Sequence, residues 1–242
     1  GLARSLVRLK APGKHRIAFL GGSITHNSGW RELLAADLRR RFPAGEIEFV
    51  NAGIPSMGST PSAFRIERDV FANGPVDLLF VEAAVNDSTN GRSDLEQLRA
   101  MEGIVRHALR RDPGMDVVLL HFVDPEKMAT IRSGAVPAVI ANHERVAEHY
   151  GLPSLDLARE VTARIDAGEF SWEQDFKALH PSPFGQLRYY RGIRRLLDAA
   201  WMDADTTAAP AARTMPTAMD AACYERGRLV DPGTATVDRG FH

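Results

Sequence analysis

The stretch IAFLGGSIT, residues 17–25, decides the fold. Four apolar residues with strand character lead into two glycines and then into Ser-Ile-Thr. A short apolar run that ends at glycines is typical of a buried strand followed by a tight turn. Three later segments, residues 51–54, 85–87 and 180–183, bring further polar and glycine residues after strand-like runs or before the last long helix. We expect all four segments to meet at one edge of a sheet.

Strand-like and helix-like patterns alternate along the chain. Short apolar runs predict strands at residues 17–20, 47–51, 78–82 and 117–122, with a weaker one near Leu155. Longer stretches with helical periodicity separate them, at residues 30–42, 61–72, 95–111, 136–150, 158–167 and 185–201. This alternation predicts an α/β fold in which helices cover both faces of a parallel sheet. In such sheets ligands bind beyond the carboxyl ends of the strands, where the four segments fall.

The composition is that of an ordinary globular domain. The chain has 242 residues, of which 44% are hydrophobic and 25% charged, and its formal net charge is -1. A chain without a strong net charge has no global attraction for nucleic acid or an anionic membrane, so neither is expected as a partner. The arginine run at residues 39–41 lies in a helix-like segment, and we interpret it as a solvated helix face rather than a phosphate site.

Cysteine content and hydropathy leave the compartment open. Cys223 is the only cysteine, so no disulfide can form within the chain. No apolar run approaches the roughly 20 residues of a membrane span, and no signal peptide is recognisable. The chain begins with Gly1 rather than Met, which is consistent with removal of a leader. A periplasmic or extracellular location is the expectation.

The character of the sequence changes near residue 203. We predict a catalytic domain over residues 1–202 and a linker-like tail over residues 203–242. The first part of this tail is rich in Ala, Thr and Pro and shows no periodicity, as linkers do.

The four segments together resemble the SGNH (GDSL-like) hydrolase superfamily. The resemblance rests on Gly21-Gly22-Ser23-Ile24-Thr25, on residues 51–60, on Val85-Asn86-Asp87 and on His180-Pro181, which follow one another in the family's order. It implies a flavodoxin-like three-layer α/β/α sandwich with about five parallel strands. It also implies hydrolysis or transfer of acyl groups on oxygen, with a serine nucleophile and no cofactor.

The resemblance assigns roles to residues in the first three segments. Ser23 is the expected nucleophile, and the alternative is that it only caps the following helix. A tetrahedral intermediate carries an oxyanion that needs preplaced hydrogen-bond donors. The candidates are the backbone N–H of Ser23, the side-chain amide of Asn86 and a glycine N–H in the second segment. Gly58 matches the family pattern better, and Gly53 is the alternative.

His180 is the expected general base, because a neutral imidazole can accept the serine proton near pH 7. His121 lies within a predicted strand and is the competing candidate, although a core or site-wall role is favoured for it. The remaining histidines are expected away from the chemistry. His107, His143 and His149 lie on helix-like segments and are predicted to be surface residues.

The third member of a triad departs from the family pattern. The family places an aspartate three residues before the histidine, and this chain has Lys177 there. Asp175, five residues before His180, is the candidate acid. The alternatives are Glu173, Asp124 or a backbone carbonyl, any of which could fix the tautomer of the imidazole.

The expected substrate is a carbohydrate ester. Residues 81–87 and 180–185 resemble a bacterial branch of the superfamily whose members often carry a β-rich module after the catalytic domain. By this analogy the tail would be the start of a truncated accessory module, and the chain a carbohydrate O-acyl esterase that removes short acyl groups, in particular acetyl. An O-acyltransferase and a non-catalytic saccharide-binding protein are the alternatives. Three aromatic residues, Trp30, Trp172 and Tyr189, are candidates for stacking on sugar rings, with core packing as the competing role. The chain lacks the His and Cys spacings of metal sites, so no metal is expected.

Overall fold

The computed structural model describes residues 1–202, 204, 213–234 and 236. Its centre is a sheet of five parallel strands in the order β2-β1-β3-β4-β5. The strands are β1 (Gly13–Gly21), β2 (Gly45–Gly53), β3 (Leu78–Glu82), β4 (Asp116–His121) and β5 (Ser154–Asp156). This is the flavodoxin-like order, whose direction reverses between β1 and β3. The predicted fold class is confirmed.

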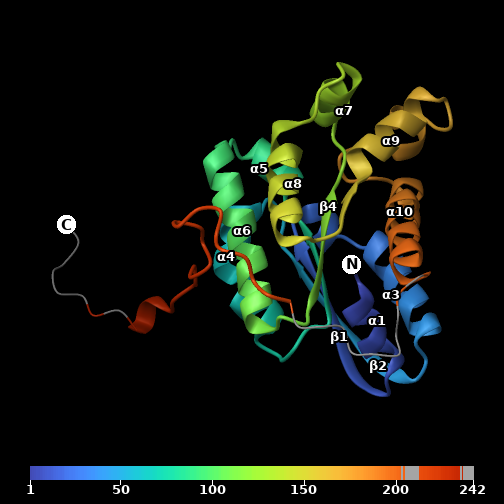
Figure 1. Ribbon diagram of the computed structural model, residues 1–242. Coiled ribbons are helices and arrows are strands. Elements are labelled where there is room, and N and C mark those ends of the chain that lie inside the picture. The colour runs from blue at the N-terminus through green and yellow to red at the C-terminus, as the bar shows by residue number, and fades with distance from the viewer. Residues whose placement is uncertain (203, 205–212, 235, 237–242) are drawn as a thin grey trace.

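Helices cover both faces of the sheet (Figure 1). On one side lie α1 (Ala3–Lys10), α3 (Trp30–Arg41), α9 (Leu157–Asp166) and α10 (Pro183–Met202), and on the other lie α4 (Ser59–Ile66), α6 (Asp94–Arg111) and α8 (Ala138–Tyr150). Shorter elements connect them: α2 (Ser23–His26), η1 (Glu67–Phe71), α5 (Ala84–Thr89), α7 (Pro125–Arg132), η2 (Trp172–Phe176) and η3 (Pro232–Thr234). The three layers follow from central strands β3 and β4, whose residues are all buried.

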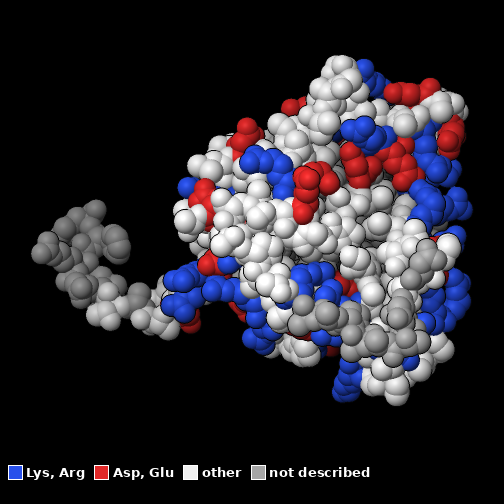
Figure 2. Space-filling view, viewed as in Figure 1, with Lys and Arg blue, Asp and Glu red and all other residues white. Residues whose placement is uncertain are grey.

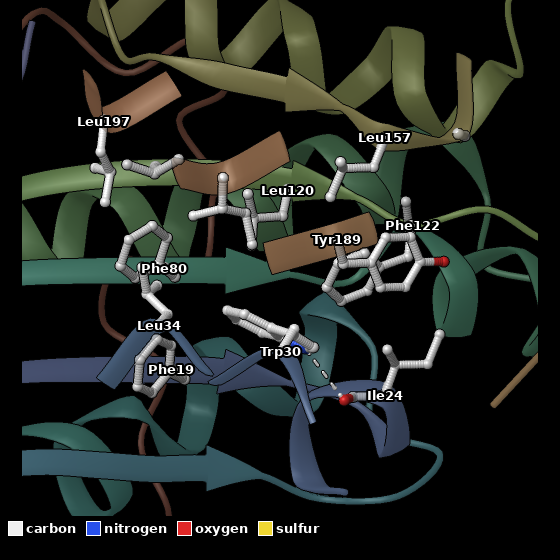
Figure 3. Close-up of a cluster of buried hydrophobic side chains, with 14 of the residues drawn as sticks. Phe19, Ile24, Trp30, Leu34, Phe80, Leu120, Phe122, Leu157, Tyr189 and Leu197 are labelled. Carbon is white, nitrogen blue, oxygen red and sulfur yellow. Dashed lines mark hydrogen bonds between the residues drawn. The ribbon is translucent and has the colours of Figure 1, made fainter. Parts of the chain in front are cut away.

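Each face of the sheet has its own hydrophobic core. Figure 3 shows the core beneath α3 and α10, where Trp30 packs edge-on against Phe19, with ring centroids 5.3 Å apart, and against Phe122 at 5.6 Å. Tyr189 stacks on the other side of Phe122 at 4.3 Å. Trp30 and Tyr189 are therefore core residues. Of the two roles considered for them, stacking on a sugar ring and packing in the core, the structure supports core packing. Trp172 is half-buried and stacks on Phe176.

The charged surface consists largely of paired groups. Figure 2 shows acidic and basic side chains interspersed on one face of the molecule, with Lys and Arg gathered along the edge that α10 forms. Arg194 and Arg41 both pair with Asp198, and Arg40 pairs with Asp37. These helix arginines are neutralised by neighbouring carboxylates, as expected for solvated helix faces.

Part of the described tail, around residues 219–224, lies against α6, and the segment with η3 extends away from the domain (Figure 1). The buried carboxylate of Glu102 accepts hydrogen bonds from the backbone N–H of Met219, at 2.5 Å, and from that of Asp220, at 3.1 Å. The N–H of Tyr224 donates to the carbonyl of Arg99 at 3.0 Å. Residues 203, 205–212, 235 and 237–242 lie outside the described part of the chain, so the accessory module stays a prediction.

Two adjacent leucines of α3 test which face of this helix packs in the core. Leu34 is fully buried in the α3–α10 core, whereas Leu33 is 38% exposed. We expect Leu34→Ala to lower the free energy of unfolding by about 2–5 kcal/mol, because it removes buried methyl groups and leaves a cavity. Leu33→Ala should cost less than about 1 kcal/mol. Urea unfolding followed by circular dichroism measures both, and equal losses would contradict the assignment of this face of α3 to the core.

Candidate active site

Ser23 lies where β1 ends and α2 begins. Gly21 closes the strand, Gly22 makes the turn, and Ser23 is the first residue of the short helix α2. The backbone N–H groups in the first turn of a helix have no partner within the helix, so the N–H of Ser23 is available as a donor. Its side chain is half-buried. The predicted nucleophile thus sits at the carboxyl edge of the sheet, beside the point where the strand order reverses.

His180 meets Ser23 although 157 positions separate the two residues. The Nε2 atom of His180 lies 2.7 Å from the Oγ of Ser23. When Nδ1 carries the ring proton, Nε2 is free to accept the serine hydroxyl proton, which is the arrangement of a nucleophile and its general base. The imidazole is exposed, so it remains open to water.

Backbone and side-chain hydrogen bonds fold the loop that carries His180. The N–H of Ser182 donates to the carbonyl of Phe176 at 2.9 Å, and the hydroxyl of Ser182 donates to the carbonyl of Asp175. Lys177 has φ 77°, in the region that non-glycine residues rarely adopt. These bonds fix the main chain on both sides of the histidine.

Asp175 has another partner in this structure. Its Oδ2 accepts hydrogen bonds from the N–H of Ser171 at 2.8 Å and from the Ser171 hydroxyl at 3.2 Å. No hydrogen bond joins it to His180. Its assignment as the acid of a triad stays a prediction, and the geometry instead gives it a role in closing the turn of η2.

Neither alternative carboxylate reaches the imidazole. Asp124 accepts hydrogen bonds from the N–H of Lys127, at 2.8 Å, and from its ammonium group, at 2.5 Å. Glu173 is exposed and makes no hydrogen bond to His180. Within the described ranges, the only hydrogen bond of His180 is the one to Ser23. The structure therefore presents a serine–histidine dyad.

The side chain of Asn86 lies directly against Gly22. A Cβ atom built on Gly22 would lie 1.9 Å from Oδ1 of Asn86, which is far inside van der Waals contact. Only glycine at this position allows the amide so close to the residue before Ser23. Asn86 lies in α5, just beyond β3, so β1 and β3 bring the first and third segments together.

A buried aspartate joins the second segment to the third. Asp87 is fully buried, and its carboxylate accepts the N–H of Ser59 at 2.8 Å and the Ser59 hydroxyl at 2.6 Å. A Cβ atom on Gly58 would lie 2.2 Å from Oδ1 of Asp87. Sequence reasoning named Asp87 within a motif but gave it no role. The signal that could have identified Asp87 is its position directly after Asn86. When one of two adjacent polar residues faces the site, the other can anchor the neighbouring loop, as Asp87 does through Ser59.

The two glycine candidates differ in whether the N–H is free. The N–H of Gly53 donates to Oδ1 of Asn51 at 3.0 Å. The N–H of Gly58 has no hydrogen-bond partner among the described residues. A donor for an oxyanion must be unoccupied before the reaction, so this geometry favours Gly58.

His121 and His143 are buried and contact carboxylates, whereas His26, in α2, is exposed and its Nδ1 lies 3.0 Å from the carbonyl of Gly53. His121 is fully buried, and its Nε2 lies 2.5 Å from Oε1 of Glu144. His143 is also fully buried, with Nε2 3.1 Å from Asp87, and burial lowers its pKa. The prediction that His143 and His107 are surface residues is wrong, because both helices turn these positions toward the domain interior.

Within the described residues there is no group of three or more His, Cys, Asp or Glu side chains placed to hold a metal ion. None of the described helices combines the length and the apolar character that crossing a membrane requires.

Comparison with known proteins identifies the family. The profile described as the GDSL-like lipase/acylhydrolase family matches residues 19–188, a span that includes every residue of the site. The chain belongs to this family. A search of curated proteins finds no match.

Solved structures of esterases share the fold. A two-domain esterase active on acetylated mannans, crystallised with mannopentaose, is 26% identical, with a TM-score of 0.75. The match covers 93% of this chain and 58% of that one, so this chain spans less than two thirds of the length of that esterase. A variant of an acetyl xylan esterase from Geobacillus stearothermophilus is 20% identical over 77% of this chain and 95% of its own, with a TM-score of 0.55.

A buried carboxylate behind the site has an unusual pKa. Glu82, the last residue of β3, is 2% exposed, and burial raises its pKa from 4.5 to about 7. A raised pKa in the folded state means that folding favours the protonated form. This group therefore lowers stability as the pH rises through the interval between the two values.

The variant Glu82→Gln tests this linkage because it removes the titrating group and keeps the shape. The stability of the wild type should fall, relative to that of Glu82→Gln, by roughly 3 kcal/mol between about pH 5 and about pH 8. Urea unfolding at the two pH values measures the change. A difference that does not vary with pH would show that Glu82 titrates in its usual range.

Proposed function

We propose that this protein is a serine esterase that removes short acyl groups, in particular acetyl, from a carbohydrate. The observation that carries the proposal is the 2.7 Å contact between Oγ of Ser23 and Nε2 of His180. Family membership supports the ester-hydrolase class. The likeness to an esterase active on acetylated mannans supports a carbohydrate ester as substrate. A periplasmic or extracellular location would fit such a substrate.

The reaction proceeds in two steps. The imidazole of His180 takes the proton from the Ser23 hydroxyl as its oxygen attacks the ester carbonyl. The N–H groups of Ser23 and Gly58 and the amide of Asn86 donate to the oxyanion of the tetrahedral intermediate. The imidazolium then protonates the sugar oxygen, which leaves as an alcohol, and the acyl group remains on Ser23. Water activated by His180 attacks the acyl-enzyme and releases the carboxylic acid.

A groove lined by residues that follow Ser23 and His180 in the sequence supports a bulky leaving group. It has a volume of about 420 Å³ and runs between the first turns of α3 and α10. One wall includes Ser28 and Leu33, and the other includes Pro183 and Leu187. These walls continue the segments that carry Ser23 and His180. We place the leaving alcohol in this groove because His180 must protonate the oxygen of that alcohol.

Removing either member of the dyad should abolish the reaction. We expect Ser23→Ala and His180→Ala each to lower kcat for p-nitrophenyl acetate by on the order of a thousandfold or more, without a change in circular dichroism. An organophosphonate probe should label the wild type at Ser23 and leave Ser23→Ala unlabelled. Near-full activity in either variant would refute the proposed chemistry.

The role of Asp175 can be separated from that of its loop. We expect Asp175→Ala to lower kcat less than about tenfold, because the carboxylate contacts Ser171 rather than the base. Ser171→Ala removes part of the same contact and should have a similar effect. A loss in Asp175→Ala much larger than in Ser171→Ala would establish a triad instead.

The substrate class is tested with polysaccharides. Hydrolysis of acetylated mannan, measured as released acetate, should be faster than hydrolysis of a p-nitrophenyl ester with a long acyl chain, measured as released p-nitrophenol. Product analysis with added mannooligosaccharide distinguishes hydrolysis from transfer, since a transferase would give acetylated oligosaccharide in place of acetate. Release of neither product from any acetylated polysaccharide would contradict the carbohydrate assignment.

A further inference from the structure

The carboxylate of Glu82 is placed directly behind the reacting groups. β3 lies beside β1 in the sheet, with Leu20 opposite Val81, so the end of β3 adjoins the turn that leads to Ser23. Oε1 of Glu82 accepts the N–H of Val85 at 3.3 Å. The N–H of Gly22 also donates to this carboxylate. One side chain thus receives hydrogen bonds from two separate segments of the site.

The two N–H groups belong to the residues that immediately precede two oxyanion donors. Gly22 precedes Ser23, and Val85 precedes Asn86. The Asn86 amide in turn lies against Gly22, so a shift of either segment would change the distance between the donors. A carboxylate that holds both main chains fixes this distance from the interior.

The free-energy cost of burying the Glu82 carboxylate argues against a purely structural role. Burial of a carboxylate without a close cation destabilises a fold, and an apolar or amide side chain of similar size would avoid that cost. The nearest ammonium group, that of Lys127, is bonded to Asp124 and Ser88. The raised pKa of Glu82 reflects this incomplete compensation. Such costs are commonly tolerated where a site needs the group.

We propose that Glu82 is a positioning residue of the oxyanion site, whose carboxylate holds the N–H of Ser23 and the amide of Asn86 at their working separation. The inference rests on the proposed esterase function. Catalytic donors must be aimed before charge develops on the substrate, and a displacement of about 1 Å can cost about a hundredfold in rate. The contribution of Glu82 therefore belongs to turnover rather than to substrate binding.

Two substitutions at one position separate this role from folding. We expect Glu82→Leu to lower kcat for p-nitrophenyl acetate by roughly 10- to 100-fold, with KM changed less than about threefold. Glu82→Gln keeps one oxygen acceptor and should lose less, about 3- to 10-fold. Its stability above neutral pH should not fall in parallel, because the buried charge is gone. Lower turnover in a variant of unchanged stability is a result that a structural role would not give.

Asp116 supplies the matched control. It is also fully buried, its pKa is also raised by burial, and it also accepts a backbone N–H, that of Ser5 at 2.7 Å. It begins β4 and thus lies at the opposite end of the sheet. Asp116→Asn should keep kcat within about twofold of the wild type.

The outcomes are distinct. The inference is overturned if Glu82→Gln and Glu82→Leu both keep kcat within about twofold, or if Asp116→Asn loses as much. Should Glu82→Leu fail to fold, Glu82→Gln decides alone. Ser23→Ala, assayed in parallel, tells the two proposals apart: its inactivity beside active Glu82 variants overturns only the positioning role, whereas its activity overturns the esterase itself.

Discussion

The contact between Gly22 and the side chain of Asn86 is the constraint on which the site depends. It requires that the first and third strands end side by side, that the residue before the nucleophile has no side chain, and that the amide points across the gap. The parallel sheet places the two strand ends side by side, and the sequence supplies the glycine at position 22 and the amide at position 86. Asp87 then extends the arrangement to the second segment through Ser59. Three loops that are far apart in the chain are thus brought together at one edge of the sheet.

The interior behind this surface is unusually polar for the centre of an α/β sandwich. Glu82, Asp87 and His143 are all buried near the carboxyl end of β3, between apolar layers on both faces of the sheet. Their hydrogen bonds go mainly to backbone N–H groups and hydroxyls of the site loops. The apolar layers provide stability, and this thin polar layer determines where the loops lie.

Much of the architecture could be predicted from residue pattern. The apolar runs of β3 and β4 and the periodicity of α6 and α10 are long or strong enough to be read directly, and their bounds agree with the structure within a few residues. Helices α1, α2, α5 and α7 were missed because each spans only about one or two turns. The stretch expected as one helix at residues 61–72 instead changes from α4 to the wider turn η1, which no pattern signals.

In the site, the order of the motifs along the chain predicted that Ser23 and His180 meet. The partner of Asp175 and the choice of glycine donor depend on local packing instead. That Ser23 lies at the carboxyl edge of the sheet follows from the alternation of strands and helices, and its pairing with His180 was expected from the resemblance to the SGNH family. The partner of Asp175 does not follow in this way, because it depends on how residues 171–182 fold back through Ser171, Phe176 and Ser182. The choice between Gly53 and Gly58 likewise depends on one hydrogen bond, which the N–H of Gly53 donates to the side chain of Asn51.

The imidazole of His180 is hydrogen-bonded at one nitrogen only, which affects how often the ring adopts the orientation that contacts Ser23. His180 is exposed and is bonded only through Nε2 among the described residues, so rotation about its side-chain bonds competes with the reactive orientation. In the proposed reaction, turnover would be the intrinsic rate multiplied by the occupancy of that orientation. In the proposed esterase, a bound substrate that contacts the exposed ring would change this occupancy. In the proposed esterase, the orientation of His180 would therefore contribute to the rate together with the groove between α3 and α10.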